Sequence, residues 1–481
     1  MSDAGAESKG AQSASAGPLP LGAFVWRFRY NYLFSVFNGM TWLIALGAPM
    51  VLLAESLGAT PAQVNLCYNF VFLLLPVQVL ATTLTPHLGF KRQMMLAWGA
   101  RAFCLLVPLG IALSSPSAPA PGWMLWALIG SIFMFTLLRS LGTPVVLPWL
   151  QAMLPDGQRG RFFTTDQSFT ALAGVGILLI CAWLAQTLQG SYAAFAWQYG
   201  LALTGGLGAL YCLRFWPDAP KPQMMPARSV LRELPRAVGA ELPVRQILAL
   251  MVVAGFVGSS FIPLTTYYLK VEAKLSTAMI LVYSALQYVG VIGGSWVLRN
   301  LLDRFGSKPF FQLSLAAGLL LDIYWLVLVV SGSGTLLWFL PLAFVWAGVG
   351  GSQWAASTTR YLAQLGNYEN RAILIAGITA TAGVGNACFA YLWGLVVKSE
   401  DAVGQVGLDA TWFAAFFAVG LLVRGGLFFA FGRLAEERPG SALRISNAGL
   451  IRPFRFFASM VNLVEPEPRK AKGRTHHKEV E

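Results

Sequence analysis

The sequence predicts an all-α integral membrane protein whose 12 transmembrane helices form two pseudo-symmetric halves of six helices each. Hydrophobic residues make up 56% of the chain and charged residues only 11%, whereas an average soluble domain has about 25% charged residues. Uncharged or nearly uncharged runs of the roughly 20 residues needed to cross a bilayer recur along the chain. Short motifs of the first half also return in the second half.

Twelve apolar runs define the predicted spans. They cover residues 31–54, 63–85, 93–114, 123–150, 166–188, 197–215, 246–269, 276–298, 309–330, 335–358, 372–397 and 410–432. The fourth run is long and contains Pro144 and Pro148, which leaves its second end uncertain. The predicted N-terminal bundle is therefore 26–215 and the C-terminal bundle 244–432.

Polar segments flank and separate the two bundles. Residues 1–25 are rich in Ser, Ala and Gly and are predicted to be disordered. Residues 216–243 are rich in proline and form a predicted cytoplasmic linker, with a possible short amphipathic helix over 229–238. Residues 433–481 form a basic tail in which 451–464 mix aromatic and basic side chains. This mixture predicts an interfacial helix on membrane lipids, with a partly disordered tail as the alternative.

Loop charges predict the orientation. Of the 34 Lys and Arg residues, only Lys270, Lys274 and Lys398 fall in loops of the predicted outer side. Because cytoplasmic loops collect Lys and Arg, both termini are predicted to be cytoplasmic. The same bias explains the net charge of +13, and no nucleic-acid partner is expected because no basic soluble domain is present.

Two sequence repeats indicate an internal duplication. Thr170-Ala-Leu-Ala-Gly-Val-Gly176 in the fifth span matches Thr379-Ala-Thr-Ala-Gly-Val-Gly385 in the eleventh at six of seven positions. Gly89-Phe-Lys91 and Gly306-Ser-Lys308 follow the second and eighth spans at a similar offset. Repeats in register predict that corresponding spans of the two halves occupy equivalent positions.

The segment Asn300-Leu-Leu-Asp303-Arg304-Phe-Gly306-Ser-Lys308 resembles the loop between helices 8 and 9 of the major facilitator superfamily. The resemblance implies a monomeric transporter of the bacterial cytoplasmic membrane that works by alternating access, with its substrate site between the halves. It also implies a gating loop made by Gly89, Lys91, Asp303, Arg304, Gly306 and Lys308. The first half departs from the family pattern, because Pro86-His87 stands where the acid–Arg pair is expected. Ordinary positive-inside charge is the alternative explanation for the loop.

In this fold the first, fourth, seventh and tenth spans line the cavity, so polar residues at helical spacing are candidates there and on neighbouring spans. The candidate substrate-binding residues are Asn38, Trp42, Asn69, Arg139, Tyr267, Tyr283, Gln287, Gln353, Trp354 and Asn386. Hydrogen bonding between helices is the alternative role for each of them. Amides together with aromatic rings favour a sugar-like solute.

Four charges lie deep in predicted spans. Arg139 is on a cavity span, where it either holds a carboxylate or phosphate of the substrate or braces the bundle. Arg101, Asp322 and Arg424 are on spans expected outside the cavity, with Asp322 and Arg424 as a possible structural pair. No acid falls in a predicted cavity span, so the coupling ion is unknown: sodium, exchange, a poorly placed acid, or none.

The sequence thus predicts a transporter of a small polar solute, with sugar-like solutes favoured. The alternatives are an organic-anion transporter with Arg139 as its charge clamp, an exporter of amphipathic compounds, and a membrane scaffold or sensor that lost transport. No enzyme activity, metal site or cofactor is expected. The five cysteines and three histidines have no ligand spacing, and no nucleophile–base pair or phosphate loop is evident.

Overall fold

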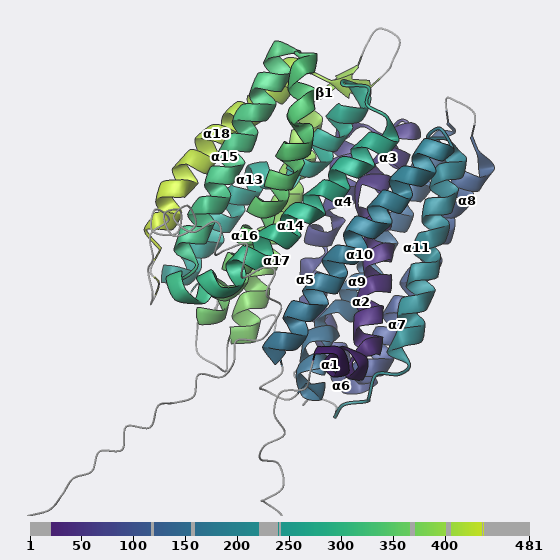
Figure 1. Ribbon diagram of the computed structural model, residues 1–481, viewed down its shortest axis with the longest axis vertical. Coiled ribbons are helices and arrows are strands. Elements are labelled where there is room, and N and C mark those ends of the chain that lie inside the picture. Colours follow the sequence, from purple (N-terminus) through teal and green to yellow (C-terminus); the bar gives the residue numbers. More distant parts are fainter. Residues whose placement is uncertain are drawn as a thin grey trace, which may run out of the picture.

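The computed structural model describes residues 21–116, 120–154, 159–220, 239, 242–365, 371–400, 406–434 and 436. These residues form two helical bundles that lie side by side (Figure 1). The first contains α1 (Leu21–Arg27), α2 (Arg29–Leu46), α3 (Ala48–Ser56), α4 (Pro61–Leu73), α5 (Leu75–Ala81), η1 (Thr82–Leu84), α6 (Thr85–Leu88), α7 (Phe90–Cys104), α8 (Leu106–Ser114), α9 (Gly122–Met153), α10 (Arg159–Thr187) and α11 (Tyr192–Leu213).

The second bundle contains the remaining helices and a two-stranded hairpin. Its elements are α13 (Leu242–Val271), α14 (Thr277–Phe305), α15 (Lys308–Ser331), η3 (Gly334–Phe339), α16 (Leu340–Gln364), α17 (Arg371–Val396), β1 (Lys398–Glu400), β2 (Val406–Leu408) and α18 (Ala410–Gly432). The predicted linker helix over 229–238, most of residues 1–25 and most of the basic tail lie outside the described residues.

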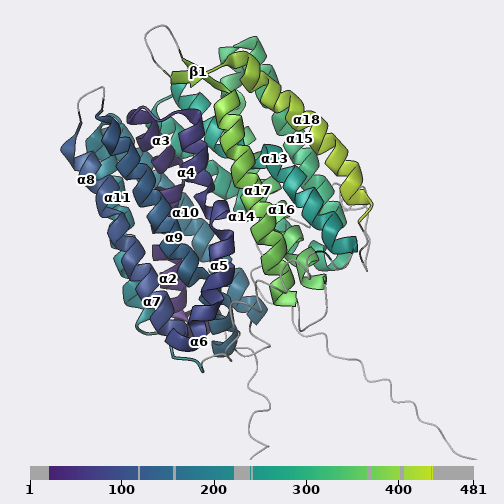
Figure 2. The ribbon, with the colours of Figure 1, turned by 180° about the vertical axis from the view of Figure 1, so that it is seen from behind.

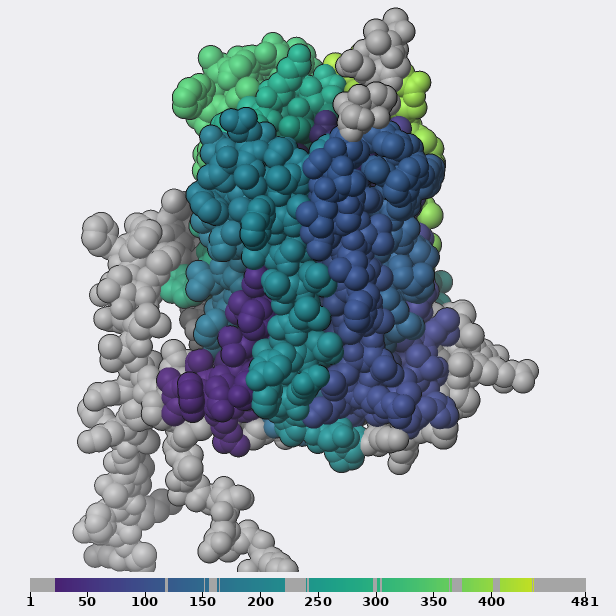
Figure 3. All heavy atoms as spheres, turned by 90° about the vertical axis from the view of Figure 1, so that its right-hand side faces the viewer, coloured from purple at the N-terminus to yellow at the C-terminus, as the bar shows by residue number. Residues whose placement is uncertain are grey.

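Eleven segments of the described chain are long and apolar enough to cross a membrane. The twelfth helix, α11, spans 22 residues but carries Gln198 and four glycines, which lower its mean hydropathy. It packs between α2 on one side and α7 and α8 on the other, as Figure 3 shows. The predicted all-α membrane fold with two six-helix halves is confirmed.

Side chains at helix starts show why the spans begin where they do. Thr60 precedes α4 and exchanges hydrogen bonds with Gln63, from Thr60 N to Oε1 (2.8 Å) and from Gln63 N to Oγ1 (3.3 Å). Asp409 accepts hydrogen bonds from two backbone N–H groups at the start of α18. These caps satisfy N–H groups that have no partner within the helix, at the point where the apolar run starts.

Two expectations about element bounds need correction, and the open end of the fourth span is now defined. Composition predicts disorder over residues 21–25, but they belong to α1, where Phe24 is buried against Phe28. The fourth span continues as one helix through Pro144 and Pro148 to Met153. The sixth span begins at Tyr192 rather than at 197, because α11 follows directly after the turn at Gly190.

The two ends of the molecule differ. The hairpin end carries β1 and β2, which pair antiparallel, and the Leu408 N–H donates to Glu272 at the end of α13 (2.9 Å). The terminus end carries α1 and α6 (Figure 1). In Figure 2 the bundles meet along α4 and α17 toward the hairpin end and diverge toward the terminus end.

The repeated motif marks the contact between the halves. α10 of the first half packs on α14 of the second, and α17 of the second half packs on α4 of the first. A Cβ added at Gly174 in α10 would lie 3.0 Å from the Tyr288 ring, and one at Gly383 in α17 would lie 2.9 Å from the Phe72 carbonyl oxygen. The corresponding glycines of the repeat therefore occupy equivalent positions at the interface.

Within the second half, α14 and α16 cross so closely that glycine is required. A Cβ at Gly348 would overlap the Gln287 carbonyl oxygen. We expect Gly348→Ala to destabilise the protein by about 1–3 kcal/mol, because the two backbones must separate. Thermal unfolding in detergent measures the effect. Gly351→Ala is the matched control, since an added Cβ there meets nothing within 4 Å. An equal loss in both variants would contradict this account of the crossing.

Candidate functional site

The centre of the first half holds two arginines. Arg101 of α7 is 1% exposed, and its guanidinium lies over the Trp98 ring (4.1 Å) and near the Phe135 ring of α9 (5.1 Å). It donates a hydrogen bond to Asn38 Oδ1 of α2, which also accepts from Trp98 Nε1 at 3.1 Å. Arg139 is partly buried and lies one turn beyond Phe135 on α9. Three helices thus bring Asn38, Arg101 and Arg139 together.

The charges of this arginine pair, Arg101 and Arg139, are not neutralised. The two positive charges repel one another, and neither forms an ion pair with an acid of the described residues. Arg139 Nη1 and Arg101 Nε are buried atoms that have no hydrogen-bond partner among the described residues. Asp166 of α10 accepts its hydrogen bond from Ser35 at 2.5 Å instead. Buried, unpaired charge is costly, so this arrangement is suited to an anion.

The sequence places the span of Arg101 outside the cavity. In the structure the long Arg101 side chain extends from α7 to Asn38 of α2 and Phe135 of α9, contacts that the span assignment did not predict. A signal was present in the sequence. Trp98 precedes Arg101 by three residues, so the two share one helix face and the indole can stack on the guanidinium.

Several other candidates lie where the halves meet near the hairpin end. Tyr267 Oη of α13 donates to the Ala59 carbonyl oxygen (3.2 Å). Asn69 Nδ2 of α4 donates to the carbonyl oxygens of Asn65 (2.8 Å) and Ser259 (3.3 Å). Asn386 of α17 lies against Gly255 of α13. Tyr267 and Asn69 thus join the halves toward the hairpin end, whereas the contact of Asn386 with Gly255 lies within the second half.

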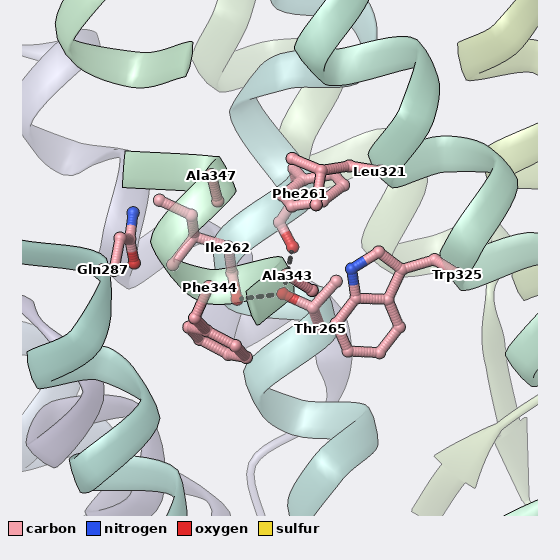
Figure 4. A pocket seen from close by; sticks show the side chains of 9 residues that line it. All are labelled: Phe261, Ile262, Thr265, Gln287, Leu321, Trp325, Ala343, Phe344 and Ala347. Carbon is pink, nitrogen blue, oxygen red and sulfur yellow. Dashed lines mark hydrogen bonds between the residues drawn. The ribbon is translucent and has the colours of Figure 1, made fainter. Parts of the chain in front are cut away.

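Candidates in the second half are mostly packed within that half. Gln287 lines a small pocket shown in Figure 4, which has room for roughly one water molecule. The other residues of its lining are Phe261, Ile262, Thr265, Leu321, Trp325, Ala343, Phe344 and Ala347. The Thr265 hydroxyl already donates to the carbonyl oxygens of Phe261 and Ile262. This pocket is too small for an organic solute.

The expectation that Trp354 faces the central cavity is wrong. Its ring packs against Phe311 of α15 (5.3 Å) and Phe431 of α18 (5.4 Å). Adjacent helical residues point about 100° apart, so Gln353 and Trp354 cannot both face the same direction. Gln353 and Trp42 are partly exposed. Tyr283 is buried, with its ring 5.7 Å from that of Phe344.

The candidate gating loops are fixed by glycine backbones. Gly89 and Gly306 have φ of 79° and 86°, in a region that favours glycine. Lys91 Nζ donates to the Arg214 and Trp216 carbonyl oxygens at 2.9 Å, which ties this loop to the segment after α11. The side chains of Asp303 and Arg304 lie outside the described residues.

The second loop is held by Glu436, which sequence reasoning missed. Its buried carboxylate accepts from the backbone N–H groups of Ser307 (2.5 Å) and Lys308 (3.0 Å) and pairs with Arg360 of α16 (2.8 Å). Each half therefore ties its own loop to the segment that follows its last helix. Glu436 is 129 positions from Ser307 in the chain, so no local pattern indicates the contact.

The predicted pair of Asp322 and Arg424 is confirmed as an ion pair between α15 and α18. Glycine leaves room for both side chains. An added Cβ would lie 2.8 Å from Asp322 at Gly420 and 2.8 Å from Arg424 at Gly318. The Arg424 guanidinium also lies 5.4 Å from the centre of the Phe261 ring. This pair is a structural element of the second half.

We expect Glu436→Ala to destabilise the protein by about 1–3 kcal/mol, because two backbone N–H groups and Arg360 lose their carboxylate partner. Thermal unfolding and limited proteolysis of the purified protein measure the loss. Glu400→Ala is the control, since it removes an exposed pair with Lys398 and should change stability by less than about 1 kcal/mol. Equal effects of both changes would show that Glu436 does not hold the loop.

Comparison with known proteins gives a consistent assignment. Residues 32–389 match the family model of the Major Facilitator Superfamily, and no curated protein matches the chain. Solved structures with the same fold include a point mutant of the nucleoside transporter NupG, with a TM-score of 0.63 and 14% identity over 85% of this chain and 99% of that chain.

A D-xylose-proton symporter also has a TM-score of 0.63 and 14% identity, over 85% of this chain and 98% of that chain. The inward-open conformation of the xylose transporter XylE from E. coli has a TM-score of 0.64 and 12% identity, over 88% and 99% of the two chains. Identities this low establish the fold and leave the substrate open.

Proposed function

The chain belongs to the major facilitator superfamily, and we propose that it moves a small organic anion across the bacterial cytoplasmic membrane by alternating access. The observation that carries the proposal is the arginine pair Arg101 and Arg139, held together inside the first half without a carboxylate partner among the described residues. A carboxylate or phosphate of the solute would supply the missing negative charge and accept charge-assisted hydrogen bonds.

The geometry supports an anion better than the neutral sugar that the sequence favoured. Two desolvated positive charges would be left uncompensated by a neutral solute. The aromatic surface expected from Trp354 is instead occupied by Phe311 and Phe431. Asn38 fits either class, since its amide can hydrogen bond hydroxyl or carboxylate groups. The structures of xylose and nucleoside transporters share only the fold with this chain.

Loop charge supports a cytoplasmic position for the terminus end, where the two bundles diverge, and this combination corresponds to an inward-facing state. Lys91, Lys308 and Arg360 lie at the terminus end, in accord with the positive-inside rule. The terminus end is then cytoplasmic, and the hairpin end, where Tyr267 and Asn69 join the halves, faces outward. Release of the solute to the cytoplasm requires no break in these contacts, whereas access from outside does.

We expect Arg139→Gln and Arg101→Gln to weaken binding of the transported anion about tenfold to hundredfold, because each removes a charge-assisted hydrogen bond. Arg139→Lys should restore binding only in part, since the planar guanidinium is lost. The measurement is a thermal-shift screen of mono- and dicarboxylates and organic phosphates against neutral polyols, followed by uptake into proteoliposomes.

Arg92→Gln is the matched control, because Arg92 is exposed on the same helix as Arg101 and should leave binding unchanged. Stabilisation by neutral polyols alone, equal in the wild type and in both arginine variants, would contradict the anion proposal. A sugar-like solute would then be the favoured substrate class.

Cysteine labelling tests the proposed orientation. In a background in which the five native cysteines are replaced, Ser331→Cys at the hairpin end should react with an impermeant maleimide in intact cells. Asp218→Cys, in the segment after α11, should react only after the membrane is permeabilised. The reverse pattern would place the termini outside.

A further inference from the structure

A cluster of neutral oxygen atoms lies at the junction of α4, α13 and α17. We call it the amide cluster, and its members are Asn65, Asn69, Ser259, Ser260 and Asn386. Asn65, Asn69 and Ser260 are fully buried. Asn65 Nδ2 lies 3.4 Å from Ser260 Oγ, and Asn69 Nδ2 lies 3.3 Å from the Ser259 carbonyl oxygen. The cluster therefore joins one helix of the first half to two of the second.

The amide orientations in this cluster are fixed by backbone carbonyl groups. Asn65 Nδ2 donates to the Ala390 carbonyl oxygen at 2.7 Å, and Asn69 Nδ2 donates to the Asn65 carbonyl oxygen at 2.8 Å. A flipped amide would place two acceptors against each other, so both Oδ1 atoms are acceptors directed away from these contacts.

Three of these acceptors are unsatisfied. The Oδ1 atoms of Asn65, Asn69 and Asn386 are buried and have no hydrogen-bond partner in the described part of the chain. Interhelical hydrogen bonding explains the NH₂ groups of Asn65 and Asn69, but it does not explain the oxygens. Ser259 Oγ uses its hydrogen on the Gly255 carbonyl oxygen (2.6 Å), which leaves its lone pairs free as well.

We propose that the amide cluster binds a monovalent alkali cation, with sodium the first choice. Its ligands would be the three amide oxygens and the two serine hydroxyl oxygens, all of them hard oxygen donors. Divalent cations such as Ca²⁺ and Mg²⁺ prefer carboxylate ligands, and no group of three His, Cys, Asp or Glu residues in the described chain could hold a metal. A site made only of neutral oxygens therefore fits a single positive charge.

The location gives the cation a part in transport. The cluster lies at the contact between the halves that closes the hairpin end. A cation bound by α4, α13 and α17 together therefore stabilises this closed contact. An opening that separates α4 from α13 and α17 divides the ligands between the halves and releases the ion. Cation occupancy is thereby linked to which side of the carrier is open.

Thermal unfolding of the purified full-length protein tests the site without any organic solute. At constant ionic strength, NaCl should raise the unfolding midpoint above that in choline chloride by at least about 2 °C, and the shift should grow with cation concentration. LiCl and KCl define the preferred ion. Because no anionic solute is added beyond chloride, failure here leaves the proposal of an organic-anion substrate untouched.

Variants assign the effect to the cluster. Asn65→Leu and Asn69→Leu should lose the cation-dependent shift. Asn386→Ala changes a partly exposed residue, so the variant should fold more readily than the other two. It should raise the cation concentration needed for the same stability shift about tenfold. Gln198→Leu is the matched control, because Gln198 is a fully buried amide in α11, away from the cluster. Its Oε1 also has no partner among the described residues, and its Nε2 donates to the Cys181 carbonyl oxygen. It should keep the full shift.

Two outcomes would overturn the proposal. One is equal stability of the wild type in sodium, lithium, potassium and choline chlorides at matched ionic strength. The other is an alkali-cation shift that persists unchanged in Asn65→Leu, Asn69→Leu and Asn386→Ala, which would place the cation elsewhere.

Discussion

Close contact between helices of opposite halves is the constraint on which the rest of this structure depends. α10 reaches α14 at Gly174, where an added Cβ would be in tight contact with the Tyr288 ring, and α17 reaches α4 and α5 at Gly383, where an added Cβ would overlap Leu75. Lipid gives no hydrophobic drive for helices to associate, so small residues and dense packing must hold the halves. The two bundles meet toward the hairpin end and diverge toward the terminus end, as Figures 1 and 2 show.

Much of the fold could be predicted from the sequence because the bilayer imposes length and polarity on every span. The repeat predicted that the fifth and eleventh spans occupy equivalent positions, and the structure shows that both lie where the halves meet. Side-chain direction was less predictable, because it depends on helix rotation: Gln353 and Trp354 are neighbours in sequence but point apart. The contacts of Glu436 could not be predicted at all, since only folding brings it to Ser307. The contacts of Arg101 were not predicted either, because its side chain reaches beyond its own helix to Asn38.

The two halves share a backbone plan but distribute charge differently. In the second half, Asp322 and Arg424 neutralise each other between α15 and α18. In the first half, Arg101 and Arg139 lie together, and Asp166 is hydrogen bonded to Ser35 rather than to either arginine. Duplication therefore preserved the geometry of helix packing while the polar interior diverged, and among the described residues the two buried arginines without an ion-pair partner both lie in the first bundle.

Arginines placed between the two faces of a membrane also respond to voltage. One elementary charge that crosses the whole potential exchanges about 2.3 kcal/mol per 100 mV. If Arg101 and Arg139 bind an anion, the loaded carrier has less net charge in the membrane than the empty carrier. The two halves of a transport cycle then differ in their sensitivity to the membrane potential, and the negative interior of a cell affects the return of the empty carrier more than the passage of the loaded one.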